Sequence, residues 1–452
     1  MAAAKRGVRD GLLLVDLGSR EARVLAVVRE AAGLRLCGTA IGAFTAARDG
    51  VVMQRELARQ QLAPLVRDVE RQAGVPLRSA MAALGGTHLG LVRASGSLEL
   101  KLPVSLRESH VEQALESAAR IGLPPDQEVL HVLPTRYRVD GATVARLPLG
   151  LRARLLVAEC ALVTASRLAL DSLERVFADL DCDLVDVAAE PLVTAGALLG
   201  AEDRRRGAAL IDIGAERIGA AVYRDHVLQG IACLGVGAAH VSRDLAYALS
   251  VDFAFAEALK HRFGVASLKE ATPGLETTLE LPAGAARVSQ VAVAQVVEPR
   301  LRELLGLVRD ALRQTQALMP GDRIVLGGGG ARLRGTAALA EDVFGLPARL
   351  ASESAAPVPP AASVPPDLSG TALGLLDYAS RCAAHGAVHE TVWRGAMQHL
   401  RHVFRAGGAR RAGGAGSRPQ AVVEAAAPEG GPVPSGVGVD LEVGDVRVRT
   451  RV

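Results

Sequence analysis

The most constraining feature of this chain is a pattern that occurs twice. In residues 208–228, AALIDIGAERIGAAVYRDHVL, an apolar run carries Asp212 near its end, bends at Gly214 and resumes as a second apolar run. Residues 12–28, LLLVDLGSREARVLAVV, place Asp16 and Gly18 in the same way. Each run predicts two strands joined by a short turn, with an aspartate and a glycine at the bend. Because the two copies lie far apart, we predict two related halves rather than a short-period repeat.

A hairpin tip that offers backbone N–H groups beside an aspartate can hold a nucleotide phosphate and its Mg²⁺. Two such hairpins facing each other across a cleft would form a phosphate clamp. A single Asp-x-Gly tripeptide most often marks an ordinary turn, so neither copy supports this interpretation alone. The pairing of the two copies favours a nucleotide cleft.

Length and composition narrow the classes of function. The 452 residues suffice for two or three domains with their own cores. A net charge of +3 and 3% aromatic residues argue against a nucleic-acid partner. The five cysteines include no C-x-x-C pair, which favours buried thiols in a reducing compartment. No signal segment and no uncharged apolar run of about 18 residues is found, so we expect a cytoplasmic protein.

The predicted elements follow the order of an α/β protein. Residues 55–73 repeat apolar side chains with a helical period and stop at Gly74. Residues 98–157 combine short alternating stretches with one amphipathic helix, which predicts a small α+β module inserted into the first half. The charged run 203–206 is interpreted as a solvated turn, and residues 266–288 as irregular or strand-rich surface structure.

Two glycine-rich turns are candidate binding elements. Residues 235–249, GVGAAHVSRDLAYAL, lead from a turn into a helix, a geometry that favours anions, although a turn with a helix cap explains the pattern nearly as well. The strand 324–326 is followed by four glycines, 327–330, which let another molecule approach the backbone closely. We favour a ligand-binding loop over a plain tight turn at this second place.

Residues 388–405, VHETVWRGAMQHLRHVFR, predict an amphipathic helix. Bulky apolar residues, including the only tryptophan, share one face and arginines share the other. This pattern is typical of a helix in a membrane interface, with its arginines near anionic headgroups. The alternative is a helix docked on the protein itself or on a partner. The predicted membrane-contacting residues are Val392, Trp393, Arg394, Met397, Leu400, Arg401, Phe404 and Arg405.

Together these segments resemble the FtsA family, the actin-like proteins of bacterial cell division. The resemblance extends from about residue 12 to about residue 405. It rests on several segments in family order, among them DLGSREAR, HVLPTRYRVDG, EPLVTAGALL, IDIG with AAVY, LGVGAAHVSRDLA, EALKHRFG and IVLGGGGARLRG.

The resemblance implies an α/β, actin-like fold of two halves around a nucleotide cleft. The boundaries that it implies are a first-half core at 10–83 and 161–205, an inserted α+β subdomain at 84–160, a second-half core at 206–240 and 320–366, a second-half outer subdomain at 241–319, a closing helix at 367–384, a membrane-targeting helix at 385–406 and a disordered tail at 407–452.

The resemblance also implies a role. FtsA-like proteins tether filaments of the tubulin-like FtsZ to the cytoplasmic face of the inner membrane at the division site. They polymerise with themselves and recruit later division proteins. On this chain the outer subdomain at 241–319 would face FtsZ, and the helix at 385–406 would contact membrane phospholipids.

ATP and Mg²⁺ are the implied ligands of the cleft. Asp16 and Asp212 would lie near Mg²⁺, which the nucleotide would hold. The residues implied to bind nucleotide are Asp16, Gly18, Ser19, Arg23, Asp212, Gly214, Gly237, Glu257, Lys260, Gly328, Gly329 and Gly330.

The phosphate side departs from the actin-like pattern. Arg23 stands where a lysine is usual, and the usual Asp-Ile-Gly-Gly-Gly-Thr reads Asp-Ile-Gly-Ala-Glu-Arg from Asp212. Glu216 would repel phosphate oxygens unless Arg217 or a metal ion compensates. We therefore expect weak or altered ATP binding and little hydrolysis. The alternatives left open are a pilus-assembly protein of the PilM type and a divergent ATPase or small-molecule kinase of the same fold.

Overall fold

The computed structural model describes residues 11–30, 33–144, 147–281, 284–351, 368–384, 440–443 and 446–449. The predicted membrane-targeting helix at 385–406 lies outside these residues. Within the tail that the resemblance implies to be disordered, β19 (Asp440–Val443) pairs antiparallel with β20 (Val446–Arg449).

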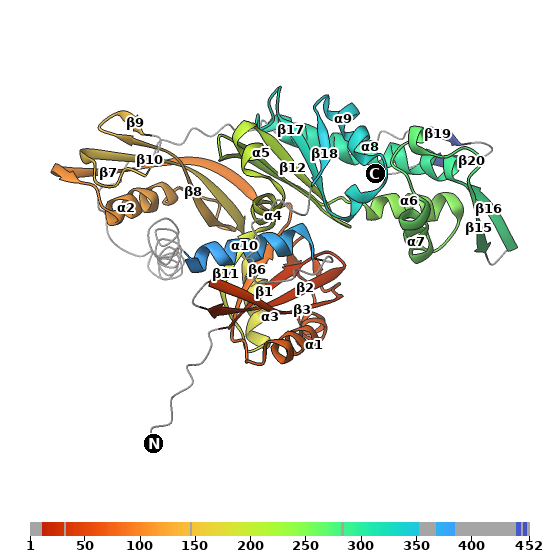
Figure 1. Cartoon of the computed structure of the whole chain (residues 1–452), viewed down its shortest axis with the longest axis horizontal. Coiled ribbons are helices and arrows are strands. Elements are labelled where there is room, and N and C mark those ends of the chain that lie inside the picture. The colour runs from red at the N-terminus through yellow and green to blue at the C-terminus, as the bar shows by residue number, and fades with distance from the viewer. Residues whose placement is uncertain are drawn as a thin grey trace, which may run out of the picture.

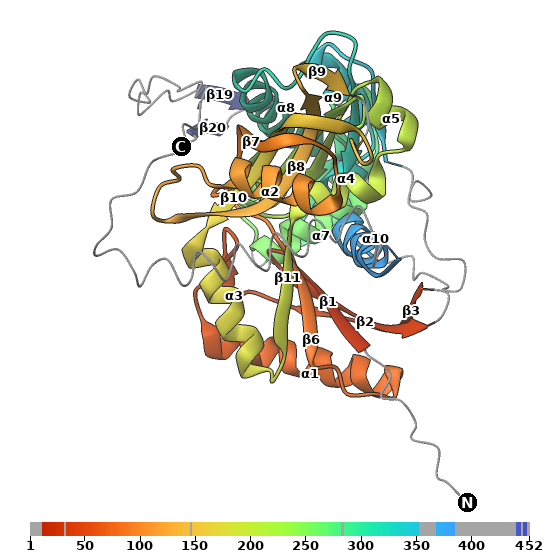
Figure 2. The same ribbon diagram turned by 90° about the vertical axis from the view of Figure 1, so that its left-hand side faces the viewer.

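The first half is built on a five-stranded sheet in the order β11-β6-β1-β2-β3. Strands β1, β6 and β11 are parallel, and β2 and β3 continue antiparallel from β1. Helices α1 and α3 cover one face, and α10 covers the other (Figure 2). The bounds are β1 (Gly11–Leu17), β2 (Glu21–Glu30), β3 (Gly33–Ala43), β6 (Ser79–Leu84), β11 (Asp183–Ala189), α1 (Arg55–Ala73), α3 (Arg167–Asp179) and α10 (Gly370–Ala384), with the short pair β4 (Ala47–Arg48) and β5 (Val51–Val52) beside them.

The second half repeats this plan with a sheet in the order β14-β13-β12-β17-β18. Alternate residues of β12 enter different cores: Ala208 and Leu210 join the core shared with the first half, whereas Ala209 and Ile211 pack toward the second half's own helices. The period of two therefore aims Asp212 toward the first half. The bounds are β12 (Ala208–Ile213), β13 (Ile218–Arg224), β14 (Val227–Leu234), β17 (Arg323–Gly327), β18 (Ala348–Leu350), α6 (Ala239–Leu249), α7 (Phe253–Phe263), α8 (Gln290–Gln314) and α9 (Thr336–Phe344).

The inserted subdomain has a separate core. One helix packs on a four-stranded antiparallel sheet in the order β7-β10-β8-β9, and the module projects from the two sheets (Figure 1). The close approach of helix to sheet requires Gly96, because a Cβ there would lie 2.1 Å from the backbone oxygen of Ala114. The bounds are β7 (Gly90–Ser105), α2 (Glu108–Ala119), β8 (Gln127–Val139), β9 (Ala142–Val144) and β10 (Arg152–Ser166).

Two helices join the halves. Helix α4 (Glu190–Leu198) contacts both sheets, and α10 packs along it (Figure 1). A Cβ on Gly374 would lie 1.9 Å from the backbone oxygen of Val193, so this glycine permits the helices to touch. The hydroxyls of Thr194 and Thr371 are hydrogen-bonded at 2.9 Å in the same interface. The parallel strands of both sheets therefore end at a common cleft beside α4 and α10.

The prediction for residues 203–206 is wrong. They belong to α5 (Ala201–Arg206), with two acidic residues in its first turn and arginines in its last, the arrangement that complements a helix dipole. Residues 266–288 hold the short helix η1 (Leu268–Glu270) and a hairpin, β15 (Glu276–Leu281) with β16 (Gly284–Ser289), in line with the strand-rich alternative.

Candidate functional site

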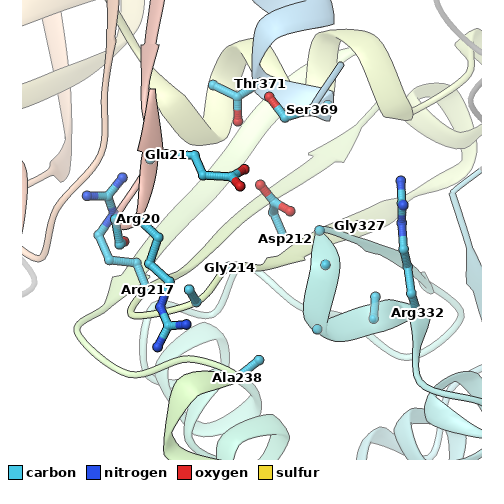
Figure 3. A pocket seen from close by; sticks show the side chains of 18 of the residues that line it. Arg20, Glu21, Asp212, Gly214, Arg217, Ala238, Gly327, Arg332, Ser369 and Thr371 are labelled. Carbon is cyan, nitrogen blue, oxygen red and sulfur yellow. The ribbon is translucent and has the colours of Figure 1, made fainter. Parts of the chain in front are cut away.

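A cavity of about 780 Å³ lies between the halves, where the parallel strands end. Figure 3 shows Asp212 and Gly214 at its centre, Gly327 and Arg332 on one side, and Ser369 and Thr371 at the start of α10. It is lined by most of the residues predicted to bind nucleotide, namely Asp16, Gly18, Ser19, Arg23, Asp212, Gly214, Glu257, Lys260, Gly328, Gly329 and Gly330.

Gly237 is the exception and does not line the cavity. A Cβ on this residue would lie 2.6 Å from the backbone oxygen of Gly214 and 2.5 Å from that of Ala215. The glycine therefore lets the loop before α6 pack against the second hairpin, and its neighbour Ala238 lines the cavity instead.

The two hairpins make the same turn. A Cβ on Gly18 would lie 2.7 Å from the backbone oxygen of Glu21, and one on Gly214 would lie 2.9 Å from that of Arg217. Each glycine therefore permits a tight bend directly after the aspartate-bearing strand. The register differs in one respect, because Asp16 pairs with Arg23 whereas Asp212 pairs with Gly219.

Asp16 is a buried carboxylate at the end of β1. The hydroxyl of Ser369 donates to its Oδ2 at 2.5 Å, and Arg23 Nη1 lies 4.0 Å from the same oxygen. Burial and the nearby charge of Glu190 raise the pKa of Asp16 to about 6, although Ser369 and Arg23 oppose the shift.

Asp212 occupies the equivalent place in the second half. Burial, followed by the charges of Glu190 and Asp16, raises its pKa to about 7. Three carboxyl groups thus meet where the two halves face each other. Their mutual repulsion disfavours full ionisation unless a cation lies among them.

The sequence did not single out Glu190, the first residue of α4. It follows β11 directly and lies where a helix N-terminus stabilises negative charge. Its Oε2 accepts a hydrogen bond of 2.8 Å from Arg217 Nη2. The sequence prediction did not include β11. Recognising that strand would have placed Glu190 at the end of the sheet, where the cleft residues gather.

Arg217 does not compensate Glu216, which corrects one prediction. Arg217 turns back toward Glu190, and Glu216 pairs instead with Arg243 at 2.7 Å and with Arg20 at 3.9 Å. The Glu216 carboxylate is one-third exposed. Its charge is therefore balanced at the rim of the cleft.

Glu257 and Lys260 lie on α7 and line the same cavity. Lys260 Nζ donates to Glu257 Oε2 at 2.9 Å and to the backbone oxygen of Ala238 at 3.1 Å. Although burial acts in the opposite direction, hydrogen bonds from Ser242 and Lys260 lower the pKa of Glu257 to about 2. The Glu257 carboxylate is therefore ionised at neutral pH, and the two Lys260 hydrogen bonds connect α7 to the residue before α6.

The glycine loop after β17 has a separate reason for each glycine. Gly328 has φ 81° and ψ 169°, a conformation that other residues avoid, and a Cβ there would lie 2.4 Å from Asp212 Oδ1. A Cβ on Gly330 would lie 2.4 Å from Ile213 Cγ2. In the described part of the chain, no heavy atom beyond the two chain neighbours lies within 4 Å of the Cβ position of Gly329, which lines the cavity.

Two features are absent from the described residues. They contain no group of three or more His, Cys, Asp or Glu side chains placed to hold a metal ion. None of their helices is long and apolar enough to cross a membrane. The predicted membrane-contacting residues, Val392, Trp393, Arg394, Met397, Leu400, Arg401, Phe404 and Arg405, all lie outside the part of the chain that the structure describes.

Comparisons with known proteins agree with this architecture. The family model described as cell division protein FtsA matches residues 209–366, and that of the SHS2 domain inserted in FtsA matches residues 86–164. The cell division protein FtsA of Pseudomonas aeruginosa is 29% identical over 352 residues, which cover 76% of this chain and 84% of the relative. That of Bacillus subtilis is 25% identical over 373 residues, covering 82% and 83%.

A solved structure of the PilM–PilN type IV pilus biogenesis complex is similar in fold. It has a TM-score of 0.56 and 17% identity and covers 82% of this chain and 98% of the solved chain. Two related sheets that end at one cleft, joined by α4 and α10 and interrupted by an α+β insertion, define a protein of the actin-like ATPase fold. The sequence matches narrow this class. The chain belongs to the FtsA family of cell division proteins.

Proposed function

We propose that this protein is a scaffold of the division ring that tethers FtsZ filaments to the cytoplasmic face of the inner membrane. The observation that carries the proposal is the inserted subdomain of β7–β10 and α2, which coincides with the match to the SHS2 domain inserted in FtsA. The FtsA family model also matches the second half, at residues 209–366. Together with the subdomain, this match favours a role in cell division over the pilus-assembly alternative, for which the similarity is one of fold alone.

Two regions are proposed as the contact surfaces. The outer part of the second half, residues 241–319, would face FtsZ. The segment at 385–406 would bind membrane phospholipids, because its apolar face and its arginines suit an anionic interface. Self-polymerisation and the recruitment of later division proteins are part of the same proposal.

We infer that the cleft binds ATP weakly and hydrolyses it little. Phosphoryl transfer needs a carboxylate or amide free to orient the attacking group. Glu190 is instead committed to Arg217, and Asp16 to Ser369. This arrangement argues against the second alternative, a divergent ATPase or small-molecule kinase of the same fold.

Vesicle flotation tests the scaffold. FtsZ of the same organism, mixed with the full chain and vesicles containing phosphatidylglycerol, is expected to float with the vesicles. A chain that ends at Ala384 and a W393E variant should leave FtsZ in the dense fraction. FtsZ that floats equally well with the shortened chain would contradict the tethering role.

A calorimetric titration of the full chain with ATP tests the cleft. We expect weak but measurable binding, and little phosphate release on prolonged incubation. Turnover at the rate of an efficient kinase would contradict the inference.

A further inference from the structure

Arg217 lies between the two halves of the cleft. It comes from the tip of the second hairpin, and its Nη2 reaches Glu190 Oε2 at 2.8 Å and the backbone oxygen of Leu17 at 3.4 Å. Leu17 follows Asp16 at the end of β1, so the guanidinium bridges the second half to the first. Its side chain is 12% exposed and that of Glu190 is 19% exposed.

The surrounding chain leaves room for this ion pair. A Cβ on Gly85 would lie 1.6 Å from Glu190 Oε2 and 3.2 Å from Arg217 Nη2. Any side chain at position 85, directly after β6, would therefore displace the ion pair of Arg217 and Glu190. The guanidinium also acts on both aspartates, because its positive charge opposes the rise in the pKa of Asp16 and of Asp212.

A divalent cation does not suit the carboxylate cluster formed by Asp16, Asp212 and Glu190. Magnesium needs oxygen ligands in nearly octahedral geometry. The Glu190 carboxylate is already paired with the Arg217 guanidinium, whose positive charge is permanent. In the described residues these three carboxyl groups are not placed to hold a metal ion together, and no other group of three His, Cys, Asp or Glu side chains is. A second cation beside the guanidinium would be repelled at short range.

We propose that the Arg217 guanidinium is the resident cation of the cleft, so that a nucleoside polyphosphate binds there without a divalent metal ion. The proposal rests on the proposed nucleotide site and adds how that site balances charge. Arginine presents several N–H donors in a rigid plane and recognises phosphate as well as carboxylate.

A second observation points to an anionic ligand. Among the described residues no group pairs with the buried Nε of Arg23, although Arg23 lines the same cavity and its Nη2 pairs with Glu21 at 2.9 Å. A buried N–H of a charged group is costly to leave unpaired. An anionic ligand that drew the Arg23 side chain into the cavity would satisfy this N–H.

Titration of the full chain with Mn²⁺ alone, followed by electron paramagnetic resonance, tests the cation without any nucleotide. The wild-type protein is expected to bind no Mn²⁺ in the cleft. R217T should gain a site that the second substitution D212N removes, and R217K should behave as wild type, since it keeps the charge. Mn²⁺ binding by wild type that D212N abolishes, or no gain in R217T, would overturn the proposal.

ATP titration in excess EDTA and in excess Mg²⁺ provides the second arm. Wild type should bind ATP about equally in both, whereas R217T should lose about tenfold in affinity in EDTA, or about 1.4 kcal/mol, and regain it with Mg²⁺. Binding by wild type that requires Mg²⁺ would overturn the proposal. Failure of wild type to bind ATP in either condition contradicts the nucleotide site itself, and the Mn²⁺ titration still decides the role of Arg217.

Discussion

Ser369 donates a hydrogen bond of 2.5 Å to Asp16, across 353 residues of sequence. The same hydroxyl accepts from the backbone N–H of Ala372 at 3.0 Å and so caps the start of α10. One side chain thus connects the closing helix to the first strand and to the cleft.

The substitution S369A is expected to lower the free energy of unfolding by about 1–2 kcal/mol, because it removes a helix cap and a hydrogen bond to a buried carboxylate. S380A is the matched control, since the Ser380 hydroxyl donates to the Leu376 carbonyl within the same helix. Urea denaturation measures both. Equal losses in the two variants would show that the bond to Asp16 contributes nothing.

The raised pKa values of Asp16 and Asp212, about 6 and about 7, predict a pH dependence. The folded protein holds more protons than the unfolded chain between about pH 4 and pH 7, so these groups make the free energy of unfolding fall as pH rises through that window. D212N, which is neutral throughout, should be more stable than wild type by about 2–4 kcal/mol near pH 8 and by less near pH 5.

Denaturation in EDTA at the two pH values checks this expectation. D126N is the control, because Asp126 is exposed and accepts a hydrogen bond from Arg167 through its backbone oxygen, which the substitution leaves in place. A D212N variant that is no more stable than wild type near pH 8 would contradict the burial of charge at this site.

Loss of the Arg217 guanidinium leaves Glu190 among two other buried carboxyl groups. R217A is therefore expected to cost about 3 kcal/mol of stability, and the double variant E190Q/R217M should recover much of it. R205A is the matched control: it removes a pair with Glu202 in which both side chains are more than half exposed and screened by water, so it should lower stability far less than R217A does. A double-mutant cycle with no coupling between the Glu190 and Arg217 substitutions would refute a direct pair.

Gly328 and Gly329 are adjacent, but the structure predicts different tolerance. G328A forces alanine into a glycine-only conformation and against Asp212, at a cost of about 2 kcal/mol or more. G329A places a methyl group in open space and should change stability by about 0.5 kcal/mol or less. Thermal unfolding of the two variants distinguishes them, and similar melting temperatures would contradict the described loop.

The sequence predicted those parts of the fold that local patterns determine. The bounds of α1, Arg55–Ala73, follow from a helical period and a stop at Gly74, whose φ of 68° closes the helix. The aspartate-bearing hairpins were confirmed because an apolar strand, an aspartate and a glycine are contiguous in each.

Local sequence patterns could not predict the contacts between segments that lie far apart in the chain. The direction of the Arg217 side chain depends on where α4 starts relative to the second hairpin, and the partner of Ser369 depends on how α10 crosses β1. The helical state of residues 201–206 was missed because Asp203 accepts from the backbone N–H of Gly200, a cap that the polar composition alone does not reveal.

Helix α10 has a mechanical consequence. It is the last described helix before the chain continues toward residues 385–406, and it is held at its start by Ser369 and along its length by the contact of Gly374 with Val193. A tensile load on the chain beyond Ala384 would pass along the axis of α10 to Asp16. Such a load would change the hydrogen bond between Ser369 and Asp16, and with it the environment of the carboxylate cluster.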